Sequence, residues 1–168
     1  MDINKIRMEF PTLRSDSPPA YLDNACVTLK PDCVVQAITD YYTKTPGCGG
    51  RSVHRYGTKV SRATSEARVK LQKFLTAESA NEVVFTRNAT HSLNQVAHGM
   101  KWEAGDVVLT TDREHNSNLV PWIQLEKEQG IDHRIVASNQ DNTFNLESFE
   151  EACSEAGNRL KLVSMSQV

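Results

Sequence analysis

The sequence has little of what marks a membrane or secreted protein. No apolar run approaches the roughly 18 residues that span a bilayer, and Met1–Lys5 lacks the basic and then apolar pattern of a secretion signal. The four cysteines show no Cys-x-x-Cys spacing and the five histidines no His-x-x-x-His spacing. We therefore expect a soluble, cytoplasmic protein with no membrane contact, no metal site, no disulfide, and thiols that are reduced and mostly buried.

The chain does contain enough apolar material for a core. Its 168 residues are 39% hydrophobic and 24% charged, which fits one medium domain or an incomplete piece of a larger one. Residues 1–75 carry twelve Lys and Arg against seven Asp and Glu, whereas residues 76–168 carry seven against fourteen. The basic run between Lys44 and Lys73 could contact nucleic acid. It contains few aromatic residues, so we favour a solvated helix face and do not expect nucleic-acid binding.

The sequence pattern changes near residue 82, from helices and irregular segments to alternating strands and helices. Residues 1–30 read as an irregular N-terminal arm, and Pro31 opens a helix whose apolar stripe we expect to be buried: Val34, Ile38, Tyr41 and Tyr42. A second, basic helix is expected over 58–75. From residue 82 onward strands alternate with helices. Strands are expected at 83–86, 107–110, 134–137 and 160–165, with helices between them, one of them over 118–129.

This alternation predicts an α/β fold with a mostly parallel sheet. Right-handed crossovers place every strand's carboxyl end at one edge, where such sheets bind ligands. A fourth strand with no covering helix after it makes the sequence look interrupted at Val168.

The segment Thr86-Arg87-Asn88-Ala89-Thr90-His91 lies between the first expected strand and its helix. The free N–H groups of a helix N-terminus, together with its dipole, suit a phosphate, and the Thr90 hydroxyl can add a donor. Asn88 can adopt the left-handed conformation. The alternative is that Thr90 merely caps the helix.

Two further polar segments should lie at the same edge. Asp112-Arg113-Glu114-His115-Asn116 follows the second expected strand, and Ser166-Gln167 follows the fourth. The His115 imidazole could stack on a planar cofactor or transfer protons, or it could simply be a loop histidine in water.

Taken in order, five segments resemble one family: Tyr21-Leu22-Asp23-Asn24-Ala25, Val53-His54-Arg55, Phe85-Thr86-Arg87-Asn88-Ala89-Thr90, Gly105-Asp106 and Glu114-His115-Asn116-Ser117-Asn118-Leu119-Val120-Pro121-Trp122. The chain resembles the class V aminotransferases that depend on pyridoxal 5′-phosphate (PLP), and within them the SufS-type cysteine desulfurases and selenocysteine lyases. The resemblance runs from about residue 20 to Val168. It implies the large domain of the fold type I PLP-dependent transferases, with αβα layers, of which residues 31–168 would be the N-terminal half.

The resemblance also implies roles for particular residues. Ala89 and Thr90 would hold the PLP phosphate, and His115 would stack on the pyridine ring as the catalytic histidine. Asn24, Ala25 and Arg55 would lie near the substrate and a dimer partner.

The family's later segments would follow Val168. They comprise Ser-Asn, the Asp that pairs with the pyridine nitrogen, the Ser-x-His-Lys segment with the cofactor-binding lysine, the sulfur-accepting cysteine, and the small C-terminal domain. Whether this chain is itself an enzyme therefore stays open.

The leading interpretation is the N-terminal portion of a cysteine desulfurase-like enzyme, inactive alone. The complete enzyme would convert L-cysteine to alanine, pass the sulfur through a persulfide to an acceptor protein, and serve iron–sulfur cluster assembly. Its partner would be a second copy in a homodimer or a complementing C-terminal chain. Alternatives are a non-catalytic binding or assembly half of a split enzyme, or another class V activity: aminotransferase, epimerase or selenocysteine lyase.

Overall fold

The computed structural model describes residues 2–166 and divides into two compact units, Met1–Val84 and Phe85–Val168. Each unit is described by itself below. The expected boundary between an N-terminal arm and the rest at residue 30 stays a prediction. None of the helices in the described part of the chain is long and apolar enough to cross a membrane.

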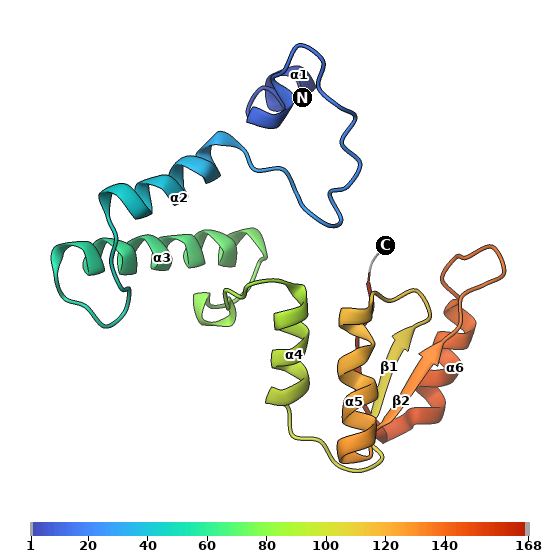
Figure 1. Cartoon of the computed structure of the whole chain (residues 1–168). Helices are drawn as coiled ribbons and strands as arrows, with labels where there is room; N and C mark the ends of the chain where they lie inside the picture. Colours follow the sequence, from blue (N-terminus) through green and yellow to red (C-terminus); the bar gives the residue numbers. More distant parts are fainter. Residues whose placement is uncertain (1, 167–168) are drawn as a thin grey trace. The chain divides into compact units, whose positions relative to one another are not determined.

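The first unit consists of helices and the loops between them (Figure 1). In chain order its elements are α1 (Ile3–Arg7), the 3₁₀ turn η1 (Pro11–Leu13), α2 (Asp32–Lys44), α3 (Arg55–Phe74) and the 3₁₀ turn η2 (Ala80–Glu82). The arm is tied to the start of α2, because the Arg14 side chain pairs with Asp32 and the Asp32 N–H donates to the Glu9 carbonyl at 2.9 Å. Pro31 precedes α2 as its N-cap, close to the expected start.

The apolar stripe expected to be buried on α2 is exposed in the structure. Ile38 is 55% exposed and Tyr42 72%, and within the described part of the first unit only Gly57 and Val83 are buried. An amphipathic helix buries its stripe only against a second apolar surface, and this unit contains no sheet that could supply one. Cys26, Cys33 and Cys48 are likewise exposed, which contradicts the expectation of mostly buried thiols.

The second unit contains a parallel three-stranded sheet between helices (Figure 1). In chain order its elements are α4 (Ala89–Gly99), β1 (Val107–Thr111), the 3₁₀ turn η3 (Asn116–Asn118), α5 (Val120–Gln129), β2 (Asp132–Val136), α6 (Leu146–Ala156), the 3₁₀ turn η4 (Gly157–Arg159) and β3 (Leu160–Val163). The strand order is β2-β1-β3, and both pairings of β1 are parallel. The α/β class and the parallel sheet expected from the sequence are confirmed.

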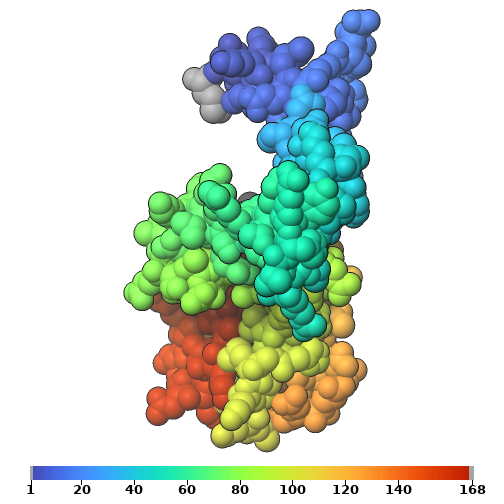
Figure 2. Space-filling view, turned by 90° about the vertical axis from the view of Figure 1, so that its left-hand side faces the viewer, coloured from blue at the N-terminus to red at the C-terminus, as the bar shows by residue number. Residues whose placement is uncertain are grey.

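Two apolar clusters give the second unit its αβα layers. On one face, Val108 of β1 packs with Trp122 and Leu125 of α5 and with Ala97 of α4. On the other face, the neighbouring β1 residues Val107 and Leu109 pack against α6. Because successive side chains of a strand point to opposite faces, β1 supplies both clusters, and its first four residues are buried. In the space-filling view the yellow-green to red part of the chain forms one continuous body (Figure 2).

The prediction of a strand at 83–86 is wrong, because these residues form no strand in the structure. Their β-branched and aromatic composition favours an extended chain, but a strand also needs a partner for its N–H and C=O groups. Both sides of β1 are taken by β2 and β3, and among residues 2–166 no strand pairs with the 83–86 segment.

An irregularity in β3 places a lysine beside the turn before β1. Val107 pairs with Leu160 but Val108 pairs with Leu162, so Lys161 is an extra residue in the ladder. Its Nζ lies 2.7 Å from the Asp106 carboxylate. The hydrogen bond from Lys161 is the largest cause that lowers the pKa of Asp106. Lys161 therefore has a structural partner at the amino end of the sheet.

Candidate functional site

A hollow of about 280 Å³ lies at the carboxyl end of β1, within the second unit. It lies between the first turns of α4 and α5 and the loop that leads to η3. Its lining consists of Thr90, Asn94, His115, Asn116, Ser117, Val120, Pro121 and Gln124. The structure thus brings together Thr90 and His115, which the sequence placed on separate loops of one sheet edge.

The N-terminus of α4 is capped by Asn88 and not by Thr90. The Asn88 side chain accepts a hydrogen bond from the His91 N–H at 2.9 Å, and Asn88 has extended backbone angles of φ −170° and ψ 174°. The cap-only interpretation of Thr90 is therefore wrong, and so is the left-handed conformation expected of Asn88. Thr90 is the second residue of the helix, where a side chain is not needed to cap the first turn.

Capping by Asn88 leaves donors available at the hollow. The first N–H groups of a helix have no intrahelical acceptor. Within residues 2–166 neither the N–H groups of Ala89 and Thr90 nor the Thr90 hydroxyl makes a hydrogen bond, and Thr90 is exposed. Three donors and the positive end of the α4 dipole therefore meet at one place, an arrangement that suits a phosphate.

His115 presents its ring at the hollow with a fixed tautomer. Its Nδ1 caps η3 by accepting a hydrogen bond from the Ser117 N–H at 3.1 Å, and it lies 2.9 Å from the Ser117 hydroxyl. Because Nδ1 acts as an acceptor, the proton of the neutral ring is on Nε2. The ring is exposed, so one face remains open to a planar ligand.

Directly before His115, Glu114 is buried at 9% exposure and accepts hydrogen bonds from three segments. Its carboxylate accepts from the Thr111 hydroxyl at 2.7 Å and from the Asn118 amide at 2.8 Å. From beyond β3, the Ser166 N–H lies 2.9 and 3.0 Å from the two oxygens, and the Ser166 hydroxyl donates at 2.9 Å. Burial raises the pKa of Glu114, but the bonds from Asn118, Ser166 and Thr111 together lower the pKa by more, so the carboxyl is ionised at neutral pH.

Asn118 extends this network into the core. Its amide nitrogen also donates to the Ser164 carbonyl at 3.1 Å, and its side-chain oxygen accepts from the Trp122 indole at 3.1 Å and from the Ser164 hydroxyl. The Glu, Asn and Trp of the Glu114–Trp122 string therefore have one structural explanation. They hold the loop after β1 to α5 and to the segment after β3.

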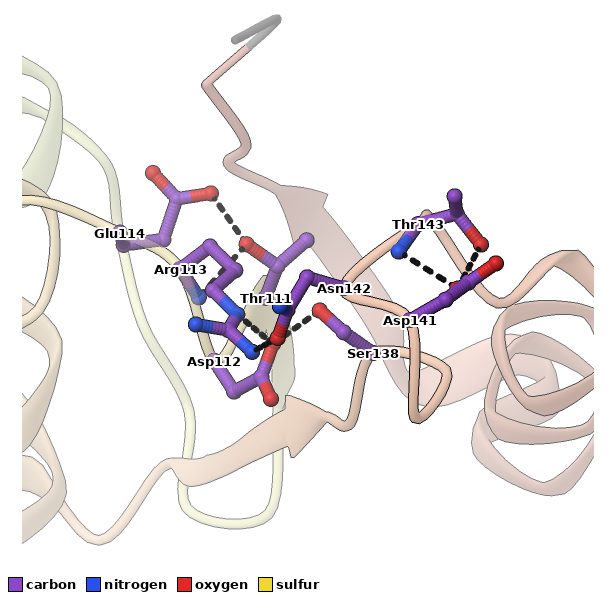
Figure 3. A network of polar contacts seen from close by, with 8 residues as sticks. All are labelled: Thr111, Asp112, Arg113, Glu114, Ser138, Asp141, Asn142 and Thr143. Atoms are coloured by element: carbon purple, nitrogen blue, oxygen red, sulfur yellow. Dashed lines mark hydrogen bonds and ion pairs between the residues drawn. The ribbon is translucent and has the colours of Figure 1, made fainter.

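A second group of polar contacts joins the loops after β1 and β2 (Figure 3). The Asp112 carboxylate accepts from the Ser138 hydroxyl at 2.5 Å, which is the largest cause of its lowered pKa. Arg113 donates to the Asn142 side chain, and Asn142 adopts a positive φ of 68°. None of these residues lines the hollow, so we assign them to loop structure and not to ligand binding.

The residues expected near the substrate belong to the first unit. Asn24 and Ala25 lie in an exposed turn closed by the Cys26 and Val27 N–H groups, which both donate to the Asp23 carbonyl. Arg55 is the first residue of α3. Their approach to the hollow stays a prediction, and Gln167, expected at the same edge as Ser166, lies outside the described residues.

Sequence reasoning missed several residues of the site. Asn94 lines the hollow because it lies one helical turn after Thr90, and Gln124 because it lies three residues after Pro121. Helical spacing could have identified both. Glu114 and Asn118 carry no comparable signal, because their partners beyond β3, Ser166 for Glu114 and Ser164 for Asn118, are distant in the sequence.

The family follows from a match over most of the chain. The pattern of the family Aminotransferase class-V matches residues 20–168. This chain belongs to that family.

Curated relatives show the same assignment and a difference in length. A probable cysteine desulfurase of Synechocystis sp. is 36% identical over 97% of this chain and 40% of its own length. One from Halalkalibacterium halodurans is 33% identical over 100% of this chain and 43% of its own length. The chain therefore spans about 40% of the length of these relatives.

Solved structures agree with the fold. An apo cysteine desulfurase from Thermococcus onnurineus superposes with a TM-score of 0.85 at 29% identity, over 100% of this chain and 40% of that one. The Escherichia coli cysteine desulfurase CsdA superposes with a TM-score of 0.78 at 26% identity, over 97% of this chain and 40% of that one. A variant of the lyase C-DES, with glycine covalently linked to its PLP cofactor, superposes with a TM-score of 0.76 at 21% identity, over 95% of this chain and 40% of that one. At this identity the likeness concerns the fold alone.

Proposed function

We propose that the hollow holds pyridoxal 5′-phosphate and that this chain supplies the N-terminal part of a cysteine desulfurase-like enzyme. One observation carries the proposal: the open donors at the N-terminus of α4 and the exposed ring of His115 line the same hollow. A phosphate and a planar ring are the two parts of PLP that these groups would recognise. When bound, PLP would supply an electron sink for the reacting amino acid.

The chain's own residues have separate tasks in this proposal. Ala89 and Thr90 bind the phosphate through two N–H groups and one hydroxyl. His115 covers one face of the ring, and its Nε2–H remains available to donate a hydrogen bond or hold a proton. Val120 and Pro121 provide an apolar wall that excludes water from one side.

The remaining proposals concern the whole protein. We propose L-cysteine as the small amino-acid substrate, with a persulfide and an acceptor protein as the route of the sulfur in cytoplasmic iron–sulfur cluster assembly. Asn24, Ala25 and Arg55 would lie near that substrate. A homodimer or a complementing C-terminal chain would supply the groups that the hollow lacks. The names of the relatives, which are cysteine desulfurases, support L-cysteine as the substrate.

Replacement of Thr90 by alanine should weaken phosphate binding without much loss of stability. A hydrogen bond to a charged group contributes about 1.5–3 kcal/mol, so the affinity for pyridoxine 5′-phosphate, which cannot label lysines, should fall about tenfold or more. The melting temperature should change little, because Asn88 is the cap. Calorimetric titration and thermal unfolding measure the two effects.

The matched control is Asn88→Ala, which removes the cap and should cost about 1 kcal/mol of stability. Once folded, this variant should bind the ligand better than Thr90→Ala does. Equal ligand affinity in Thr90→Ala and in the parent chain would contradict the phosphate role of Thr90.

Replacement of His115 by phenylalanine should preserve more ligand binding than replacement by alanine. Both variants lose the Nδ1 cap of η3, so the difference between them isolates the planar ring. Aromatic stacking contributes about 0.5–1.5 kcal/mol, which corresponds to a roughly two- to tenfold difference in the dissociation constant of pyridoxine 5′-phosphate. Equal affinities for the two variants would argue against stacking.

A further inference from the structure

We propose that Glu114 is a positioning residue, which fixes the His115 ring at the hollow and couples it to the segment that follows β3. The proposal rests on the proposed function in one respect: the position of His115 matters for cofactor binding only if the hollow holds PLP. The hydrogen bonds of Glu114 themselves involve no ligand. Among residues 2–166 no cation pairs with this buried carboxylate; its partners are neutral donors from Thr111, Asn118 and Ser166.

Glu114 connects the two ends of the loop that carries His115. Its partners Thr111 and Asn118 lie at the two ends of the segment that contains His115. The His115 side chain itself is bonded only locally, to Ser117, among the described residues. The direction of the ring is therefore set by the backbone around it, and Glu114 ties both ends of that backbone together.

The negative charge of the Glu114 carboxylate suits the donors around it. An ionised carboxylate is acceptor-only and offers about four lone-pair sites, whereas a neutral side chain of the same shape would place a donor against donors. Thr111, Asn118 and Ser166 all present donors to it. Hydrogen bonds to an ionised group are about twice as strong as neutral ones, so the charge makes the tie rigid.

The tie made by Glu114 also reaches across the sheet. Ser166 follows β3, on the opposite side of the network from Thr111 at the end of β1, and it donates through both its N–H and its hydroxyl. Ser164 strengthens the connection through Asn118. A displacement of the segment after β3 should therefore change the position of the His115 ring, because the buried Glu114 carboxylate connects the two.

The test compares Glu114→Gln with Glu151→Gln, which makes the same chemical change at an exposed position of α6. The full chain is labelled with ¹⁵N in histidine, and the ring nitrogens of His115 are observed by NMR above pH 7.5. In the parent chain we expect the Nε2–H tautomer. In Glu114→Gln we expect the ring resonances to shift toward a mixture of tautomers, with about threefold or greater loss of affinity for pyridoxine 5′-phosphate. Glu151→Gln should match the parent in both measurements.

A second variant covers the case in which Glu114→Gln does not fold. Ser166→Ala removes one donor and keeps the backbone N–H, and it should move the His115 resonances in the same direction by a smaller amount. A lower melting temperature with unchanged His115 resonances and unchanged affinity would overturn the proposal, because Glu114 would then serve stability alone. If the parent chain does not bind pyridoxine 5′-phosphate, the proposed function fails, and the ring resonances still decide the role of Glu114.

Discussion

The 168-residue chain alone should release no sulfide from L-cysteine beyond the rate given by free pyridoxal 5′-phosphate. Chemistry with this cofactor uses a lysine that holds it covalently. The residues that line the hollow include no lysine. The three lysines of the second unit lie elsewhere: Lys101 follows α4, Lys127 is in the last turn of α5, and Lys161 is paired with Asp106. All three are at the ends of their elements away from the carboxyl edge of the sheet.

The measurement combines borohydride reduction after incubation with PLP, intact-mass analysis with site mapping, and an assay for sulfide. We expect low, scattered labelling of exposed lysines and no turnover. A full-length cysteine desulfurase serves as the positive control. One stoichiometric adduct at a single lysine, together with turnover well above free PLP, would show that this chain contains a complete site.

Replacement of Trp122 by alanine should cause the largest loss of stability of any single change in the second unit. The side chain is fully buried between β1 and α4. It packs edge to face with Trp102, with the two ring centroids 6.2 Å apart. Truncation of a buried tryptophan costs about 3–5 kcal/mol, a large share of the roughly 5–15 kcal/mol that stabilises a typical domain. The change also removes the indole donor to Asn118, which loosens the network around Glu114.

Urea unfolding followed by circular dichroism measures this loss. Trp122→Phe keeps most of the apolar contact and loses the N–H donor, so its cost should lie clearly below that of Trp122→Ala. Phe144→Ala is the exposed control, since Phe144 is 48% exposed in the same unit. If Trp122→Ala and Phe144→Ala destabilised the chain equally, the core described here would be wrong.

The secondary structure of the second unit could be predicted well because its signals are local. β1 was expected at 107–110 and is Val107–Thr111, and the helix expected over 118–129 is α5, preceded by the turn η3. Gly130 ends α5 with a left-handed φ of 73°, a conformation that glycine adopts without steric cost. Alternating strands and helices then permit few topologies, and a parallel sheet is the common one.

The site could be predicted only in part, because its residues come from both local and distant contacts. Thr90 and His115 line one hollow, as their place at the carboxyl edge of a parallel sheet predicts. The N-cap of α4 could not be predicted from the sequence. Asn88 and Thr90 are both good capping residues, and only the backbone angles decide between them.

By itself the sequence determined the order of the helices and strands from α4 onward, the parallel α/β class and the edge at which Thr90 and His115 meet, because turn residues and hydrophobic periodicity act over a few residues. Tertiary structure alone decided the rest. Residues 83–86 are extended but unpaired, since a strand depends on a partner and not on composition. Glu114 is buried and ionised because Ser166, far along the chain, supplies donors that compensate for the lost water.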